Sequence, residues 1–554
     1  SVLLPLQCRS CSFLVSNFDL AHTNFTHVNY HLQFRGPDVT NVHRHHKGWT
    51  FIHNLLSMTG SNWTLQPFVS NDNKVLALFN GEVYNYRELA TRRKSQGGLG
   101  MEWDVSQSDG VILIPAYQQW GSSFVNHLRG EFAIVLVDFA KDVVLLSTDV
   151  FSTKPLWYSV FSCSAITSSS TITREGTAQM DTPCFVTASY ESALRRIGIP
   201  KRFRKMAEPN EALALDIAND FKPISKKVIF EFDLHQHKTS TEDWQRAFLN
   251  SVRLRTEGIK HQVFVGMSAG YDSGAIMLAL EILKKPFLSY HISTKSDYLN
   301  VIHERSKYCR RASTTVIKLD TKSYEKQKQW LRDRIEPYHY VGVDKGRLVV
   351  DDKASIGLSC ILSRVTQQGG YIYLSGSGAD ETISDYSMNG RKIYGHSCFS
   401  GRFPANLSEI FPWCSFYKGT QRAYLMKEEL TGGAHGIESR YPFLDPFVVQ
   451  EYLWLTAEVK NSEYKRPIAD FLREFDFPNQ YGEKAGFGVV HNQSNISVSN
   501  YQQTGKIISP TEYASTSKFS ARGYRMVQPP FVFDKMVTLL LLFCFIAQRC
   551  YKLV

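Results

Sequence analysis

Apolar and β-branched residues occur in short runs along the first part of the chain. Residues 49–53, 74–79, 132–138 and 142–147 are runs of this kind, and polar or glycine-containing breaks separate them. Such runs predict β-strands. Because two layers of mainly antiparallel sheet are the natural way to bury strands of this type, we expect an N-terminal layered antiparallel β-sandwich flanked by helices.

The pattern changes in the second half, where strand and helix patterns alternate. A helix is expected to begin near Thr241, since Thr, Glu and Asp there match N-cap and first-turn preferences. Residues 262–267, 287–292 and 370–374 are predicted strands, and residues 275–284 form a predicted helix. This alternation predicts an α/β domain with a parallel sheet and crossover helices.

Composition narrows the class of protein. The 554 residues, 43% hydrophobic and 21% charged, predict two or three globular domains. The net charge of +11 is modest over this length and indicates a basic surface, so we expect no nucleic-acid partner. The uncharged run at residues 536–547 is shorter than the roughly 20 residues that span a bilayer, so we expect no membrane partner either.

Cysteine usage bears on the redox environment. Ten cysteines are too sparse for a disulfide scaffold, which predicts mostly reduced thiols in a cytoplasmic protein. Cys8 and Cys11 have CxxC spacing, but the sequence contains no second pair with this spacing. A structural zinc site is therefore not expected.

Two loops of small residues follow predicted strands in the second half. Residues 268–274 read Ser-Ala-Gly-Tyr-Asp-Ser-Gly, and residues 374–381 read Leu-Ser-Gly-Ser-Gly-Ala-Asp-Glu. Small residues let backbone N–H groups approach a phosphate, and a helix N-terminus adds favourable partial charge. If both loops lie at the carboxyl edge of one sheet, Asp272 and Asp380 could share a Mg²⁺ ion bound to pyrophosphate.

These two loops resemble those of the glutamine-hydrolysing asparagine synthetases. The first is similar to the Ser-Gly-Gly-x-Asp-Ser loop of ATP-pyrophosphatases, and the second to the Ser-Gly-Glu-Gly-x-Asp-Glu loop of the synthetases. Further synthetase-like segments lie at residues 436–445, 465–473 and 484–488. The first half resembles a class II glutamine amidotransferase domain at residues 35–38, 80–85, 108–109, 130–133 and 149–156.

The resemblance implies a domain plan. Residues 1–10 would be an extension or propeptide, residues 11–228 the glutaminase domain and residues 229–490 the ATP-dependent synthetase domain. Residues 491–554 would be a tail of unknown role, irregular over about 492–525. The glutaminase domain would be Ntn-hydrolase-like. The synthetase domain would be an α/β parallel sheet with helices, similar to ATP-pyrophosphatases and adenine nucleotide α-hydrolases.

The resemblance also implies roles in the first half. Cys11 would be the nucleophile that attacks the glutamine amide, with its own α-amine as the base. The Asn80 side chain and the Gly81 N–H would hold the oxyanion. Glu82 and Asp109 would hold the glutamine amino group and its surroundings.

In the second half the implied cofactors are ATP and Mg²⁺. Residues that would bind ATP or pyrophosphate lie in the two loops: Ser268, Gly270, Asp272, Ser273, Ser375 and Gly376. Asp272 and Asp380 would be the metal ligands, and Lys484 would be a catalytic cation near the reacting phosphate. ATP would activate a carboxylate as an acyl-adenylate, and ammonia from glutamine would convert it to an amide.

The sequence departs from the family pattern at several positions. Residues 1–10 would have to be removed to free the amine of Cys11. Leu55 stands where an arginine pairs with the glutamine carboxylate, which predicts weaker glutamine binding. Gly274 replaces a serine, and Ser377 replaces a glutamate that is thought to contact the activated intermediate or the amine.

These departures leave alternatives open. The acid that is amidated could be aspartate or another carboxylate, and the substitutions hint at an acid other than free aspartate. A ligase or cyclase that uses another amine, with an inactive glutaminase domain, is one alternative. A non-catalytic scaffold is another. A homodimer is compatible with the sequence.

Overall fold

The computed structural model describes residues 11–18, 20, 24–55, 64–92, 98–100, 108–163, 183–293, 298–340, 347–388, 390–392, 395 and 397–481. All of these described residues lie in one compact unit. The predicted domain division at 228/229 therefore stays a prediction. The irregular tail and the apolar run at 536–547 also lie outside the described part of the chain.

The first half contains two six-stranded sheets with antiparallel pairing. One sheet has the order β10 (Lys205–Met206), β8 (Trp157–Ser162), β9 (Pro183–Ala188), β1 (Ser12–Ser16), β3 (Thr50–Leu55), β2 (Val39–Arg44). The other has the order β12 (Lys222–Val228), β11 (Glu211–Asp216), β7 (Val143–Thr148), β6 (Gly130–Asp138), β5 (Val75–Val83), β4 (Phe68–Val69). The four strands predicted from apolar runs are confirmed as β3, β5, β6 and β7.

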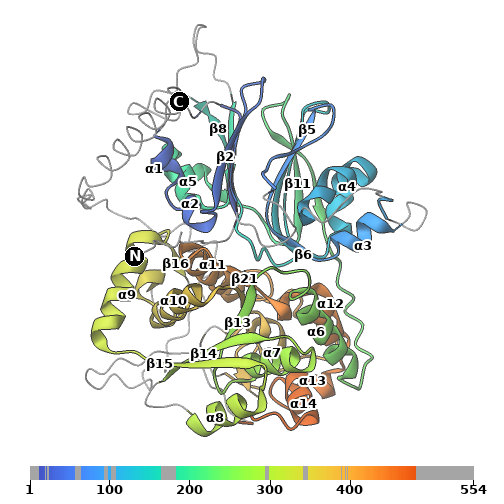
Figure 1. Cartoon of the computed structure of the whole chain (residues 1–554). Coiled ribbons are helices and arrows are strands. Elements are labelled where there is room, and N and C mark those ends of the chain that lie inside the picture. The colour runs from blue at the N-terminus through green and yellow to red at the C-terminus, as the bar shows by residue number, and fades with distance from the viewer. Residues whose placement is uncertain are drawn as a thin grey trace, which may run out of the picture. The chain divides into compact units, whose positions relative to one another are not determined.

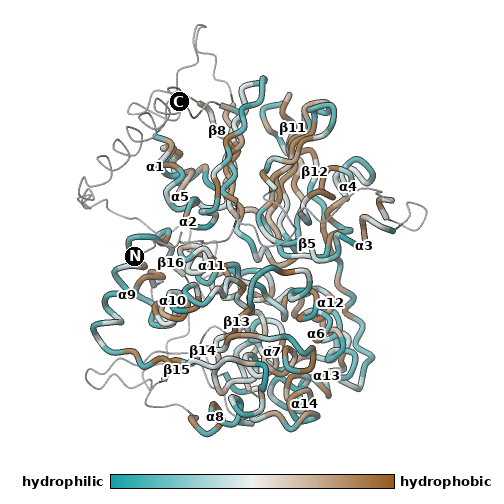
Figure 2. Tube along the Cα trace, viewed as in Figure 1, coloured by the Kyte–Doolittle hydropathy of each residue, from teal (hydrophilic) through white to brown (hydrophobic). Residues whose placement is uncertain are grey.

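One apolar core joins the two sheets. Phe13 and Phe51 of the first sheet pack in the same buried cluster as Leu78, Val135 and Leu213 of the second. Hydrophobic residues accordingly follow the strands in Figure 2. The helices of this half are α1 (Phe25–Asn29), α2 (Leu32–Arg35), α3 (Tyr86–Thr91), α4 (Leu113–Trp120) and α5 (Glu191–Ile197), with 3₁₀ turns η2 (Asp109–Ile112), η3 (Gly121–His127) and η5 (Lys201–Phe203).

The second half contains a five-stranded parallel sheet. Its order is β15 (Ala312–Lys318), β14 (Phe287–Ser293), β13 (Gln262–Gly266), β18 (Gly370–Leu374), β21 (Glu438–Arg440). The predicted parallel sheet with crossover helices is therefore confirmed. Two-stranded pairs are β16 (His339–Tyr340) with β17 (Arg347–Leu348) and β19 (Ser387–Met388) with β20 (Arg391–Lys392).

Helices cover both faces of the parallel sheet, as Figure 1 shows. Alternate residues of β13 account for this, because Val263 and Val265 share one apolar cluster with α7 while Phe264 shares another with α10. The helices are α6 (Glu242–Leu254), α7 (Tyr271–Ile282), α8 (Leu299–Tyr308), α9 (Thr321–Arg334), α10 (Lys353–Val365), α11 (Gly419–Ala434), α12 (Pro446–Trp454), α13 (Ala457–Ser462) and α14 (Arg466–Glu474). Shorter helical turns are η6 (Val349–Asp351), η7 (Thr366–Gln368), the π-helical η8 (Asp380–Ser384), η9 (Leu407–Glu409) and η10 (Pro442–Leu444).

Buried ion pairs connect the two halves. Arg255, at the end of α6, bonds Glu131 of β6 at 2.7 Å, and Arg129 bonds Asp445 at 2.9 Å. Asp445 also lies 3.2 Å from Arg255, so these four charges form one network. Within the described residues, no helix is both long and apolar enough to cross a membrane.

The expectation of mostly reduced thiols is wrong for four cysteines. Cys163 is bonded to Cys184, and Cys398 is bonded to Cys414. The first pair follows from strand register, since β8 and β9 pair Phe161 with Cys184 and so bring Cys163 close. A sequence count cannot reveal that register. Cytoplasmic localisation stays a prediction.

Candidate functional site

The first group of predicted site residues lies at the start of β1 and along β5. Arg35, at the end of α2, links them: its Nε donates to the Cys11 carbonyl at 2.9 Å, and its Nη2 donates to Asn80 Oδ1 at 3.4 Å. The Asn80 side chain is buried, and its Nδ2 has no protein acceptor. An unused buried donor next to Cys11 suits an oxyanion that forms during reaction.

Gly81 follows Asn80 and could not carry a side chain here. Its φ is +124°, and a Cβ would lie 1.9 Å from the Glu131 carbonyl oxygen of the neighbouring strand β6. The glycine therefore lets β5 and β6 pair closely at a backbone conformation that favours glycine.

Two buried acids extend the same site. Asp109 Oδ2 accepts the Val83 N–H at 2.7 Å, and Glu82 Oε1 lies 3.1 Å from Arg440 Nη2. Burial, followed by the charge of Asp109, raises the pKa of Glu82, and burial also raises the pKa of Asp109. Two crowded carboxyls of this kind attract a cationic group that would neutralise them.

Leu55 lies at the end of β3, where the family pattern has arginine. Its side chain is buried and apolar, so it offers no charge to a carboxylate. The buried cation that the structure places beside Cys11 is Arg35, and Arg35 is paired with Glu429 of α11.

The second group of predicted residues lies where β13 and β18 end. These strands are parallel neighbours, so the loops that follow them meet at one sheet edge. In the first loop, Ser268 Oγ accepts the Gly270 N–H at 3.2 Å and lies 2.9 Å from Ser273 Oγ. In the second loop, a Cβ on Gly376 would lie 2.9 Å from the Cβ of Asp272, so the two loops touch.

A lysine that the sequence analysis did not select joins the two loops. Lys465 Nζ lies 2.6 Å and 2.8 Å from the two carboxylate oxygens of Asp272 and 2.9 Å from Asp380 Oδ1. Tyr464 donates its hydroxyl to Asp380 at 3.3 Å. We call Asp272, Asp380 and Lys465 the aspartate cluster. The two aspartates raise the pKa of Lys465 despite its burial.

The backbone conformation of Lys465 sets the position of its ammonium group. Lys465 has φ +50° and ψ +47°, a left-handed conformation, immediately before α14. Few non-glycine residues adopt it, so its presence at this position marks a local constraint. Lys484, which was predicted as the catalytic cation, lies outside the described residues.

The aspartate cluster fits a magnesium ion bound to substrate phosphates. Mg²⁺ is commonly held by one or two carboxylates together with phosphate oxygens and water. Asp272 and Asp380 converge on one point, the ammonium of Lys465, so they can reach one cation. Among the residues that the structure describes, no cluster of three or more His, Cys, Asp or Glu forms a separate metal site.

Arg305 of α8 holds the backbone of the first loop. The sequence analysis did not select this residue either. It is fully buried, and its guanidinium donates to the carbonyls of Ser268 and Gly270, the latter at 3.1 Å. Burial lowers the pKa of Arg305 to about 9, so it stays charged at neutral pH. A Cβ on Gly274 would lie 2.5 Å from Arg305 Nη2. The departure from serine at Gly274 therefore makes room for this arginine.

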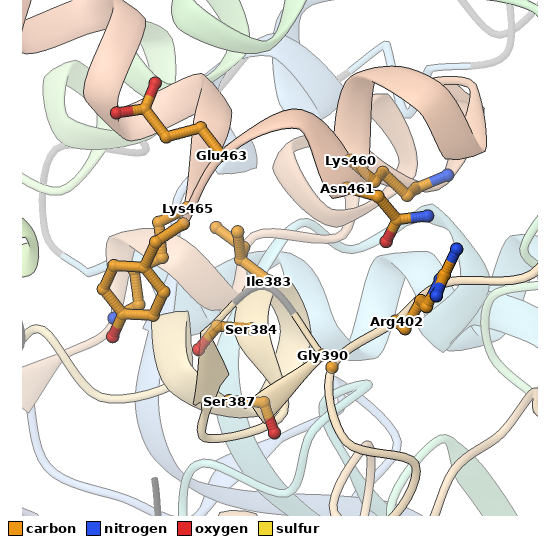
Figure 3. A pocket seen from close by; sticks show the side chains of 11 residues that line it. Ile383, Ser384, Ser387, Gly390, Arg402, Lys460, Asn461, Glu463 and Lys465 are labelled. Atoms are coloured by element: carbon orange, nitrogen blue, oxygen red, sulfur yellow. The ribbon is translucent and has the colours of Figure 1, made fainter. Parts of the chain in front are cut away.

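A cavity of about 150 Å³ lies beside the aspartate cluster. Ser384 and Lys465 form part of its wall (Figure 3). Tyr464 also lines it. Asn461 of α13 adds a polar group from the segment just before Tyr464, and Arg402 adds one from a different segment. The cavity could accept a polar or anionic group next to the site where the two loops meet.

Comparisons with known proteins agree on the kind of protein that this chain resembles. Residues 11–197 match the family described as "Glutamine amidotransferase domain". The putative asparagine synthetase (glutamine-hydrolyzing) 1 of Methanocaldococcus jannaschii is 26% identical over 446 residues, which cover 76% of this chain and 72% of the relative.

Two other relatives match over shorter stretches. Asparagine synthetase (glutamine-hydrolyzing) 2 of Bacillus subtilis is 32% identical over 129 residues, which are 23% of this chain and 16% of the relative. Amidase chyE of Penicillium rubens is 36% identical over 105 residues, which are 19% of this chain and 14% of the relative.

The family resemblance inferred from the loop motifs is thus confirmed. It rests on the glutamine amidotransferase match in the first half and on the long alignment that extends into the second. This chain is thus similar to the glutamine-hydrolysing asparagine synthetases, and its residues 11–197 match the glutamine amidotransferase domain.

Proposed function

We propose that this chain is an ATP-dependent carbon–nitrogen ligase that takes its nitrogen from glutamine and converts a carboxylate to an amide. The observation that carries the proposal is the meeting of two phosphate-type loops at one sheet edge, where Asp272 and Asp380 share the ammonium of Lys465. The same compact unit holds Cys11 and Asn80, joined through Arg35.

In the glutaminase half, the Cys11 thiolate would attack the glutamine side-chain amide and release ammonia, and a thioester would then be hydrolysed. The free Nδ2 of Asn80 supports its role as an oxyanion donor, together with the Gly81 N–H. Glu82 and Asp109 would bind the glutamine ammonium, which relieves the crowding of two buried carboxyls. This half works only in a chain that begins at Cys11, because the base is the free α-amine.

In the synthetase half, the loop residues Ser268, Gly270, Ser273, Ser375 and Gly376 would surround the ATP phosphates. Asp272 and Asp380 would hold Mg²⁺, which neutralises phosphate charge when bound. Lys465 carries a permanent positive charge at the same point, so it would stabilise the departing pyrophosphate. Lys484 stays a prediction for a second cation.

The cavity beside the aspartate cluster is our candidate site for the acid that is amidated. Arg402 and Asn461 in its wall suit a polar or anionic substituent on that acid, such as the amino-acid group of aspartate. The acid could equally be a different carboxylate. Replacing Arg402 with glutamine should raise the KM for the acid and leave the KM for ATP unchanged.

The fold similarity of each half, the domain boundary, the cellular location and the oligomeric state are parts of the same proposal. The first half would be Ntn-hydrolase-like and the second similar to ATP-pyrophosphatases, with a boundary near residue 228. A cytoplasmic location and a homodimer are further parts of it.

A chain that begins at Cys11 tests the proposal. It is incubated with glutamine, Mg-ATP and aspartate or another acid, and glutamate, pyrophosphate and AMP are measured. Cys11→Ala should stop the use of glutamine but retain amide formation with ammonium chloride. Pyrophosphate release with a supplied amine, but without glutamate, would instead favour a ligase with an inactive glutaminase domain. Loss of both activities in Cys11→Ala would contradict separate half-reactions.

A further inference from the structure

Helix α11 presents two adjacent glutamates to different sites. Glu429 contacts Arg35 and lies 2.8 Å from Lys154 Nζ, so it is paired with cations of the first half. Glu428 bonds the loop after β18 instead: its two carboxylate oxygens accept the hydroxyls of Ser375 at 2.6 Å and Ser377 at 2.8 Å.

The two carboxyls differ in charge state because their partners differ. The cations beside Glu429 lower its pKa. Burial raises the pKa of Glu428, and the groups that bond its two oxygens are neutral hydroxyls rather than cations. Of the two acids, Glu428 is therefore the one whose surroundings favour the uptake of a proton.

Few charges near Glu428 oppose its protonation. Lys427 precedes it but lies 3.3 Å from Asp352 of α10, which binds its charge. Glu429 favours protonation of Glu428 by repulsion. Tyr373 of β18 and Tyr441, whose hydroxyl donates to Glu429, also lie within electrostatic reach of Glu428, and burial raises the pKa of both.

Ser377 is the link to the reacting groups. It lies in the loop that carries Ser375 and Gly376, and Asp380 of the aspartate cluster follows three residues later. The Ser377 N–H donates to Ser375 Oγ at 3.1 Å, so this loop conformation is held by the same hydroxyl that bonds Glu428. The serine thus connects the half-buried carboxyl of Glu428 to the predicted nucleotide loop.

We infer that Ser377 and Glu428 form the proton-accepting pair for the amine that attacks the activated acid. This inference rests on the proposed function. Ammonia forms a C–N bond with the acyl carbon of the acyl-adenylate, and the C–O bond to phosphate breaks so that AMP leaves. One N–H proton passes to Ser377 Oγ as the hydroxyl proton passes to Glu428. A serine alone could not hold that proton, but the carboxylate behind it can.

The test separates adenylation from amide formation. Exchange of labelled pyrophosphate into ATP reports adenylation without an amine, and amide formation is measured with ammonium chloride, Mg-ATP and a panel of small carboxylic acids that begins with aspartate. Glu428→Gln should lower kcat for amide formation by about a hundredfold or more, the usual contribution of a general base. Pyrophosphate exchange should change by about threefold or less.

The pH profile gives a readout that a purely structural role would not move. In Glu428→Gln the acidic limb of kcat for amide formation, measured at saturating free ammonia, should disappear. In Ser377→Ala the limb should shift to higher pH, because a hydroxyl that stabilises the carboxylate is lost. The double variant Ser377→Glu, Glu428→Ala returns an acid to the loop and should recover part of the rate. Glu325→Gln on the exposed side of α9 is the matched control.

The outcomes are distinct. Unchanged amide formation in Glu428→Gln, with exchange intact, overturns the inference while leaving the proposed function. Equal loss of exchange and amide formation also overturns it, because the residue would then serve the fold or ATP binding. Absence of exchange in the wild type with every acid tested overturns the proposed function and this inference with it.

Discussion

Replacement of Glu429 gives the most specific structural prediction, because its one carboxylate is ion-paired with two buried cations. Its Oε1 lies 2.8 Å from Lys154 Nζ and accepts the Tyr441 hydroxyl at 2.8 Å, and its other oxygen contacts Arg35. Glu429, Arg35 and Lys154 are all essentially inaccessible to solvent. Glu429→Gln keeps the side-chain shape but removes the carboxylate paired with Arg35 and leaves Lys154 with the more distant Glu131, 3.9 Å away.

Removing one partner from a buried ion pair costs about 3–5 kcal/mol in free energy of unfolding. We expect a loss of this size at pH 7 in urea denaturation followed by tryptophan fluorescence. The pKa of Glu429 lies below its unfolded value of 4.5, so its stabilisation is present above pH 4.5 and is lost as the pH falls through the folded-state value. The difference between wild type and Glu429→Gln should therefore narrow below pH 4.5.

The same variant should impair glutamine hydrolysis. Arg35 holds the Cys11 carbonyl and the Asn80 side chain, and Glu429 holds Arg35. Loss of that anchor should lower glutaminase kcat by about tenfold or more, since a misplaced oxyanion donor is costly. Glu325→Gln should change stability by about 0.5 kcal/mol or less. A loss for Glu429→Gln below about 1 kcal/mol, the range of exposed pairs, would refute the reasoning.

Three further predictions concern the second half and the cysteines. Gly274→Ser should lower stability by about 1–3 kcal/mol and raise the KM for ATP, because the new Cβ displaces Arg305; unchanged values in denaturation and kinetics would contradict this. Lys465→Met should reduce pyrophosphate exchange by about a hundredfold or more, as expected for loss of a charge that stabilises the transition state. Mass spectrometry after alkylation should find that four cysteines react only after reduction, whereas full labelling without a reductant would exclude the two disulfides.

Local patterns in the sequence were sufficient for the antiparallel strands of the first half, the parallel sheet of the second half and the meeting of the two loops. The buried strand before Ser268 and the strand before Ser375 are visible as apolar runs, and parallel pairing then places both loops at one edge. The family motif likewise located Asn80 and Cys11, which the structure joins through Arg35.

The residues that were missed depend on tertiary contacts. Lys465 lies in a recognised segment, but its role follows from a left-handed backbone that turns its ammonium toward both aspartates. Arg305 is remote in sequence from the loop it supports, and only the unusual glycine at position 274 hinted at it. Glu428 could not be linked to Ser377 until helix α11 was placed against the loop. The disulfides depend on strand register and loop packing in the same way.

Transfer of the glutamine amide nitrogen tests the central claim most directly. A chain that begins at Cys11 is given glutamine labelled with ¹⁵N in the amide, unlabelled ammonium at low concentration, Mg-ATP and the acid that supports pyrophosphate exchange. The account predicts an amide that carries ¹⁵N, with one glutamate, one AMP and one pyrophosphate formed for each amide. An unlabelled product, or labelled ammonia released without any amide formation, would contradict it.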